Sequence, residues 1–111
     1  MVTLTNVGTA YDFISASQGL GMQRIDFTGV TQIAMDLRVN KIGTGTQSWQ
    51  LWNETDAAEI GVINDAGAAG VKTLSATFNV ALSGEKLVRL RVKSTVAGDD
   101  PLLLSPSVLV K

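Results

Sequence analysis

The sequence predicts an all-β protein, an antiparallel β-sandwich of the jelly-roll type with seven to eight strands. Apolar and polar residues alternate one by one over most of the chain, as they do in strands with one buried face. Glycine, proline and aspartate interrupt the alternation at near-regular intervals, as turns do. This strand count suits two small sheets. A jelly roll is built in this way, so it is the preferred form. An immunoglobulin-like sandwich is less favoured, because its cysteine pair around a buried tryptophan is missing.

The N-terminal part is expected to contribute short strands. The first seven residues alternate weakly, and they predict either a short strand or, as part of residues 1–10, an N-terminal arm that reaches a neighbouring subunit. Residues 11–14 form a second short apolar piece. Residues 22–28 place Ile25 and Phe27 on one face, and Gly29 ends this segment.

The clearest strands are predicted over residues 31–41 and 86–95. Both carry apolar residues on one face, namely Ile33, Met35, Leu37 and Val39 in the first, and Val88, Leu90 and Val92 in the second. The opposite face of the second strand carries a cationic row of Arg89, Arg91 and Lys93. We therefore expect residues 86–95 to form a central strand with one face in the core and one basic face.

Two further strands are predicted over residues 46–53 and 58–64. The first places Trp49 and Leu51 on one face and Trp52 on the other, so the two tryptophans should lie in different environments. The second places Ile60 and Val62 on a common face.

The last two strands are predicted over residues 73–82 and 102–110. The first alternates regularly, with Leu74, Ala76, Phe78, Val80 and Leu82 facing inward. Pro106 interrupts the second. Because proline has no N–H for the ladder, this strand should lie at a sheet edge or contain a bulge.

The composition bounds the function. The chain has 111 residues, 45% hydrophobic and 17% charged, which fits a single domain over residues 1–111. It has no histidine and no cysteine, so the commonest general base, metal ligand and thiol nucleophile are missing. We therefore expect a protein that is not an enzyme and that holds no cofactor and no metal.

The net charge of −1 disfavours general nucleic-acid binding, which depends on neutralising phosphates. The N-terminus does not look like a signal peptide, and no apolar run is long enough to span a membrane. The cationic row of Arg89, Arg91 and Lys93 could contact nucleic acid or an acidic glycan. The near-neutral total favours a solvated face, or pairing with Asp36 and Asp26 on neighbouring strands.

Several loops carry polar residues that are candidates for a metal-binding, glycosylation or phosphate-binding site. Asp99-Asp100 could contribute calcium ligands, but two adjacent carboxylates before a proline are ordinary turn chemistry. Asn53 opens an N-x-T sequon, which without a signal peptide carries no weight, and Asp56 and Glu59 nearby favour a polar connection over a metal site. Residues 65–70 lack the lysine and hydroxyl of a phosphate-binding loop, so they predict a flexible tip or a contact surface.

Large apolar residues on outward faces are the more informative group. By alternation, Trp52, Leu87, Leu103 and Leu109 lie opposite the core residues of their strands. An outward tryptophan stacks on a sugar ring or anchors a protein interface, or both faces of its strand are covered. Several such groups on one small domain favour burial between subunits, so these four residues are the predicted interface.

The segments WQLWN (49–53), LSGEKLVRLRVKST (82–95) and GDDP (98–101) resemble small β-sandwich virion proteins of tailed bacteriophages. These include capsid decoration, or cementing, proteins. The resemblance implies a jelly roll that self-associates, often as a trimer, and binds the major capsid lattice or another virion protein. It also implies a location in the virion after synthesis in the host cytoplasm, without catalysis or cofactors.

A carbohydrate-binding or receptor-binding β-sandwich module is the alternative. In that case Trp52 or Tyr11 would form the platform for a glycan. The two hypotheses differ in what an outward Trp52 contacts, which is a second subunit in one and a sugar in the other.

Overall fold

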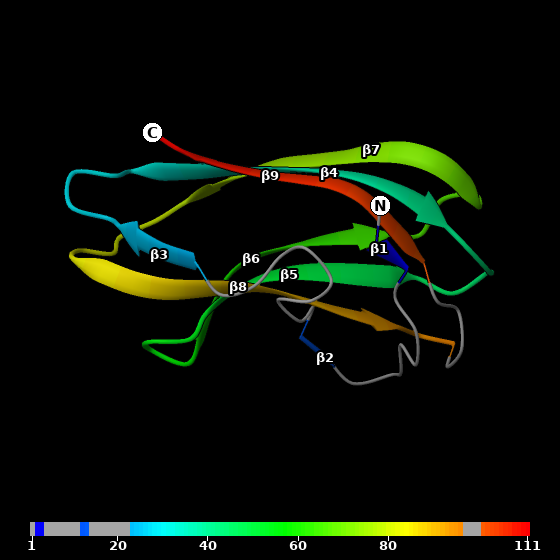
Figure 1. The fold of residues 1–111 in the computed structure, drawn as a ribbon, viewed down its shortest axis with the longest axis horizontal. Coiled ribbons are helices and arrows are strands. Elements are labelled where there is room, and N and C mark those ends of the chain that lie inside the picture. The colour runs from blue at the N-terminus through cyan, green and yellow to red at the C-terminus, as the bar shows by residue number, and fades with distance from the viewer. Residues whose placement is uncertain (1, 4–11, 14–22, 97–100) are drawn as a thin grey trace.

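The computed structural model describes residues 2–3, 12–13, 23–96 and 101–111. It confirms an all-β antiparallel sandwich of two facing sheets (Figure 1). The described strands are β1 (Val2–Thr3), β2 (Asp12–Phe13), β3 (Gln23–Asp26), β4 (Gln32–Lys41), β5 (Gln47–Asn53), β6 (Ala58–Asp65), β7 (Gly70–Asn79), β8 (Glu85–Ser94) and β9 (Leu102–Val110). In the described part of the chain, no helix has the length and hydrophobicity to cross a membrane.

The strand pairing is nested about the β5–β6 hairpin. β5 pairs with β6, β4 with β7, β2 and β3 with β8, and β1 with β9. Pairing of β4 with β9 and of β5 with β8 then gives the sheet orders β1-β9-β4-β7 and β2-β8-β5-β6. This is the jelly-roll arrangement that the sequence predicts. Because β2 and β3 pair with successive parts of β8, the nine described segments occupy eight strand positions.

The core lies between the sheets and consists of the residues that alternation places inward. The fully buried apolar residues are Phe27, Ile33, Met35, Leu37, Val39, Trp49, Leu51, Val88, Leu90, Val92 and Leu103. Trp49 is wholly buried and Trp52 is half-buried, so the prediction that the two tryptophans differ in environment is confirmed. The inward face of β7 packs against this core at its margin, through Leu74 and Phe78.

The predicted outward orientation of Leu103 is wrong, because β9 contains a bulge. Arg38 pairs with Ser105 but Val39 pairs with Leu103, so Leu104 is an extra residue on β9. One extra residue reverses the alternation of a strand. Leu103 is therefore in the core, at 1% exposure, whereas Leu109, beyond the bulge, is 59% exposed on the outer face as expected.

A second bulge separates Ile60 from Val62, which the sequence places on one face. Leu51 pairs with Gly61 and Trp52 pairs with Glu59, so Ile60 is the extra residue of β6. Ile60 packs on the core, while Val62 lies opposite Gln50 on the outer face. The predicted common face is wrong for the same reason as at Leu103.

The prediction for Pro106 is confirmed. Pro106 pairs with Leu37 of β4 on one side, and the described part of β1 reaches the other side of β9 only at Leu102 and Leu103. Pro106 therefore lies where no described strand pairs with the other side of β9, and β9 also contains the bulge at Leu104. Of the predicted N-terminal arm, Val2 and Thr3 pair with β9 of their own chain, and the other residues of 1–10 lie outside the described part.

Gly61 lets the edges of the two sheets approach each other. A Cβ built on Gly61 would overlap the ring of Phe78, which lies on β7 in the facing sheet. The absence of a side chain at position 61 therefore makes room for the half-buried ring of Phe78, which packs against the core.

We expect Gly61→Ala to lower the free energy of unfolding by about 1–3 kcal/mol, since the added methyl group overpacks this contact. Chemical denaturation monitored by tryptophan fluorescence would measure the change. The double variant Gly61→Ala with Phe78→Leu should lose less stability than the sum of the two single variants, because the smaller side chain leaves room for the methyl group. Strictly additive losses would contradict the contact.

Candidate functional site

The outer face of the sheet formed by β5, β6 and β8 carries a connected set of polar and aromatic side chains. We call it the tryptophan face, and it consists of Ser48, Gln50, Trp52, Glu59, Val62, Leu87, Arg89, Arg91 and Lys93. In register, Gln50 lies opposite Arg91 and Trp52 lies opposite Arg89. These groups are adjacent because antiparallel neighbours on one face are about 5 Å apart.

Gln50 is the centre of a polar network on this face. Its side-chain Nε2 donates a hydrogen bond to Glu59 Oε1 at 2.8 Å, and its Oε1 accepts one from Arg91 Nε at 2.6 Å. Although it lies on the outer face, Gln50 is only 4% exposed. The network therefore holds a carboxylate and a guanidinium in fixed positions on either side of the amide.

Arg91 also orients Trp52. The guanidinium carbon of Arg91 lies 3.8 Å from the centroid of the Trp52 ring, which is a cation–π arrangement. Arg91 thus covers one face of the indole while its Nε is bonded to Gln50. Trp52 is half-buried within a single chain, so part of its surface stays accessible to a ligand or partner.

The cationic row lies on the tryptophan face as the sequence predicts, but its expected acidic partners bond elsewhere, and Asp26 lies opposite Glu85 at the start of β8. Asp36 lies on the other sheet, where its Oδ1 accepts a hydrogen bond from Ser75 at 2.5 Å. Asp26 accepts a hydrogen bond from the backbone N–H of Thr28, which lowers its pKa. The predicted pairing of the row with these two acids is therefore wrong.

The four residues of the predicted interface do not form one patch. Trp52 and Leu87 share the tryptophan face, where Leu87 lies two residues from Arg89 along β8. Leu109 lies on the outer face of the opposite sheet, and Leu103 is in the core. A single subunit contact through all four residues is thus excluded by their positions.

The β5–β6 turn borders the tryptophan face and is tied to β8. Asn53 donates a side-chain hydrogen bond to Asp56 Oδ2 at 2.8 Å, and the same oxygen is 2.9 Å from Lys86 Nζ. The hydrogen bonds from Lys86 and from Asn53 hold the pKa of Asp56 below its ordinary value. Asn53 is 1% exposed and its side-chain amide is hydrogen-bonded within the turn. The asparagine of the sequon therefore serves to close the turn.

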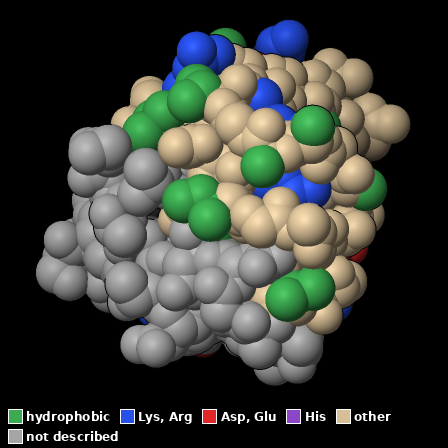
Figure 2. Space-filling model, turned by 90° about the vertical axis from the view of Figure 1, so that its right-hand side faces the viewer, with side chains coloured by type: hydrophobic (Ala, Val, Ile, Leu, Met, Phe, Trp, Pro, Cys, Tyr) green, Lys and Arg blue, Asp and Glu red, His purple; other side chains and the backbone are tan. Residues whose placement is uncertain are grey.

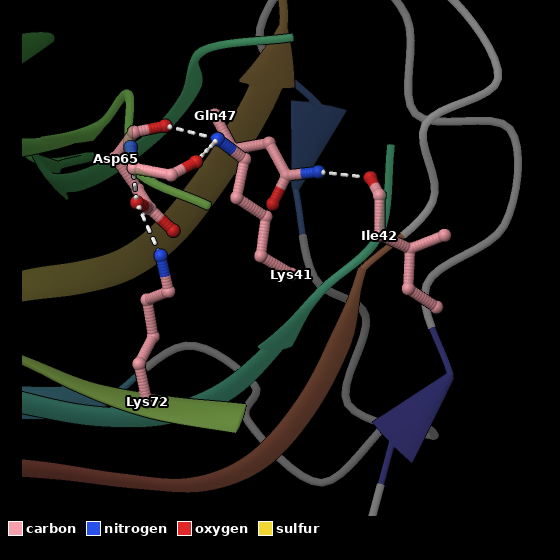
Figure 3. Close-up of polar contacts among 6 residues, drawn as sticks. Lys41, Ile42, Gln47, Asp65 and Lys72 are labelled. Carbon is pink, nitrogen blue, oxygen red and sulfur yellow. Dashed lines mark hydrogen bonds and ion pairs between the residues drawn. The ribbon is translucent and has the colours of Figure 1, made fainter. Parts of the chain in front are cut away.

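A second polar cluster lies at one end of the sandwich, around the β6–β7 turn (Figure 3). Lys41 is only 2% exposed, and its ammonium group donates hydrogen bonds to the carbonyl oxygens of Asp65, at 3.2 Å, and of Gly67. Lys72 forms an ion pair of 3.0 Å with Asp65 Oδ1. The glycine-rich stretch, which the sequence predicts as a flexible tip or a contact surface, is therefore held by a buried lysine.

Viewed toward this end of the molecule, the hydrophobic side chains of the described residues lie in separate small groups (Figure 2). The described residues contain no group of three or more acidic side chains that could hold a metal ion.

Three residues that the sequence offers as candidates lie outside the described part of the chain. They are Asp99 and Asp100, the candidate calcium ligands, and Tyr11, the alternative platform for a glycan.

Sequence reasoning missed Gln50 and Glu59 as members of the site. The signal for Gln50 was available, because it shares its side of residues 46–53 with Trp52. Glu59 had no such signal, since its position opposite Trp52 depends on the bulge at Ile60.

No family model matches the sequence, and no curated protein matches it. Several solved structures share the fold. One is the C-terminal CBM6 of LamC, a marine laminarinase from Zobellia galactanivorans, with a TM-score of 0.55 and 15% identity over 98% of this chain and 99% of that one. Another is a CBM4 structure, with a TM-score of 0.55 and 11% identity over 99% and 94% of the two chains. A third is a CBM36 carbohydrate-binding module in complex with calcium and xylotriose, with a TM-score of 0.51 and 15% identity over 97% and 93%.

At this level of identity, these likenesses establish the fold alone. They confirm the β-sandwich that the sequence predicts. They do not support a family of bacteriophage virion proteins, so that resemblance is correct only in its fold.

We expect Lys41→Met to lower the free energy of unfolding by about 1–3 kcal/mol, because the carbonyl oxygens of Asp65 and Gly67 lose the ammonium donor that Lys41 supplies. Urea unfolding of both proteins would measure the difference. Lys111→Met removes an exposed charge as a control and should change stability by less than about 0.5 kcal/mol. Equal effects of the two substitutions would contradict a structural role for Lys41.

The depressed pKa of Asp56 predicts a pH dependence. A carboxylate with a lowered folded-state pKa stabilises the protein above its unfolded-state pKa of about 4, and this contribution is lost as the pH falls through the folded-state pKa. The stability advantage of the wild type over Asp56→Asn should therefore be full near pH 6 and vanish in more acidic solution. Urea titrations across this range would test it, and a difference that does not vary with pH would contradict the link to Lys86.

Proposed function

We propose that this chain is a non-catalytic carbohydrate-binding module and that the tryptophan face is its binding surface. The observation that carries the proposal is Trp52, an outward aromatic ring held by Arg91 beside the fixed Gln50–Glu59 pair. The face thus combines a flat apolar ring with pre-oriented polar groups.

This combination matches the chemistry of a sugar. The C–H-rich face of a pyranose packs on the accessible surface of the indole, as apolar surfaces do on aromatic rings. Hydroxyl groups at the sugar rim donate to the carboxylate of Glu59 and accept from Arg91, whose positions the network already fixes. Because these side chains are ordered before binding, less conformational entropy is lost when the sugar binds.

The fold similarity supports the same proposal. Three structures that share this fold at TM-scores above 0.5 are carbohydrate-binding modules, one of them in complex with xylotriose. The histidine- and cysteine-free composition agrees with a binding role rather than catalysis.

A virion structural role is the competing proposal, in which the chain self-associates on a capsid lattice. One observation favours it. Leu109 and Val71 are 59% and 56% exposed on the outer face of the sheet opposite the tryptophan face, where burial by a partner would stabilise them. In that case Leu109, and not Trp52, would carry the contact.

Substitution of Trp52 separates the two proposals. We expect Trp52→Ala to weaken binding to a panel of soluble β-glucans and xylans, measured by affinity electrophoresis and calorimetry, by at least about tenfold. Leu109→Ala, the control on the opposite sheet, should leave this binding unchanged. The proposed binding surface is wrong if none of these polysaccharides slows the migration of the wild type. It is also wrong if Trp52→Ala binds as well as the wild type.

A further inference from the structure

We propose that β7 is an association edge, at which a second copy of this chain adds its own β7 in antiparallel orientation. The proposal does not depend on the carbohydrate-binding role, because β7 belongs to the sheet opposite the tryptophan face.

β7 is an exposed edge strand in the described part of the chain. It pairs with β4 on one side, and the sheet order places no described strand on its other side. Its side chains on the outer face are exposed throughout, and they are Val71, Thr73, Ser75, Thr77 and Asn79. A partner strand can therefore approach this edge without displacing a described strand.

The backbone hydrogen bonds show which groups point to the open edge. Gln32 and Lys111 exchange both backbone hydrogen bonds, at 2.9 and 3.3 Å, so the backbone of Gln32 faces β9 and that of Ile33 faces β7. Ile33 lies opposite Phe78, so these two residues face each other with their backbone groups. The bond from Val80 N–H to the Thr31 carbonyl at 3.0 Å agrees, because Thr31 and Val80 each lie two residues from this pair.

It follows that the even-numbered residues of β7 bond to β4. The odd-numbered residues direct their N–H and C=O groups to the open edge, and these are Val71, Thr73, Ser75, Thr77 and Asn79. The same five residues carry the exposed side chains.

The free edges of β9 and β6 are protected, whereas β7 carries one such device, Lys72, which lies on its inner side near its start and is ion-paired with Asp65. β9 has Pro106 and the bulge at Leu104, and β6 has the bulge at Ile60 and the exposed Glu59. Proline, bulges and charges are the devices by which edge strands avoid pairing. β7 pairs with β4 in unbroken register over its whole length, and its outer-face residues carry no charge.

The sequence of β7 is self-complementary about Ser75. A two-fold axis between two copies of Ser75 places Thr73 opposite the partner's Thr77, and no two like charges face each other. Paired threonine and serine residues are favourable cross-strand neighbours. Since the edge-facing residues meet only each other in this register, their N–H and C=O groups form the alternating bonds of a regular antiparallel ladder.

The pairing would also bury apolar surface. Leu74, Ala76 and Phe78 on the inner side of β7 are half-buried within one chain. The two-fold register places Leu74 opposite the partner's Ala76, so that each strand covers the exposed part of the other.

The full chain should be a dimer that dissociates on dilution in sedimentation-velocity runs. Ser75→Lys places two like charges at the axis and should raise the dissociation constant at least tenfold. Ser107→Lys is the matched control, because Ser107 lies in the same row of the same outer face but on β9. A monomer throughout the dilution series, equal effects of the two variants, or a trimer would overturn the proposal, since edge pairing about a two-fold axis closes with two copies.

The register can be tested by single cysteines, because the chain has none of its own. Opposed residues in a hydrogen-bonded antiparallel pair have Cα atoms about 5.5 Å apart, within the range of a disulfide. Mild oxidation should cross-link Ser75→Cys with itself, and Thr73→Cys only when it is mixed with Thr77→Cys. Cross-linking of Ser75→Cys no greater than that of Ser107→Cys would overturn the register.

Discussion

The nested pairing about the β5–β6 hairpin is the constraint on which the rest of the structure depends. The turn of this hairpin is fixed from two sides, because Asn53 closes it through Asp56 and Lys86 ties Asp56 to β8. The backbone N–H of Glu54 also donates to the Leu87 carbonyl at 2.8 Å. Once β5, β6 and β8 are in register, the outward residues Gln50, Trp52, Glu59 and Arg91 are adjacent. The proposed binding surface is therefore a consequence of a turn that lies outside it.

The alternation of apolar residues predicted the fold class and most of the core. It placed Trp49, Leu37 and Leu90 inward, because side chains in an unbroken strand alternate strictly. It failed at Leu103 and at the Ile60–Val62 pair, since each bulge reverses the alternation beyond it. Pro106 signals the irregularity of β9, and Gly61 lies beside the bulge of β6, but the position of each extra residue is set by pairing with a distant strand.

The candidate site was predictable in part. Trp52 and the cationic row were identified from their faces alone, and the structure places them on one surface. Their partners were not predictable, because the choice of Gln50 over Asp36 as the neighbour of Arg91 depends on sheet order. Periodicity indicates which face a residue occupies, whereas strand order determines what it touches.

The position of β7 has a consequence for how strongly such a protein would hold a surface. The two-fold axis of an antiparallel strand pair is perpendicular to the sheet, so it keeps both copies the same way up. An edge dimer would then present both tryptophan faces on the same side, each on the sheet beneath the joined one. Two weak sites that face one polymeric surface bind it with avidity, because the second site engages at a high effective concentration. If the tryptophan face binds sugar as proposed, such a dimer would bind an extended polysaccharide tightly, while each of its two sites would still exchange rapidly.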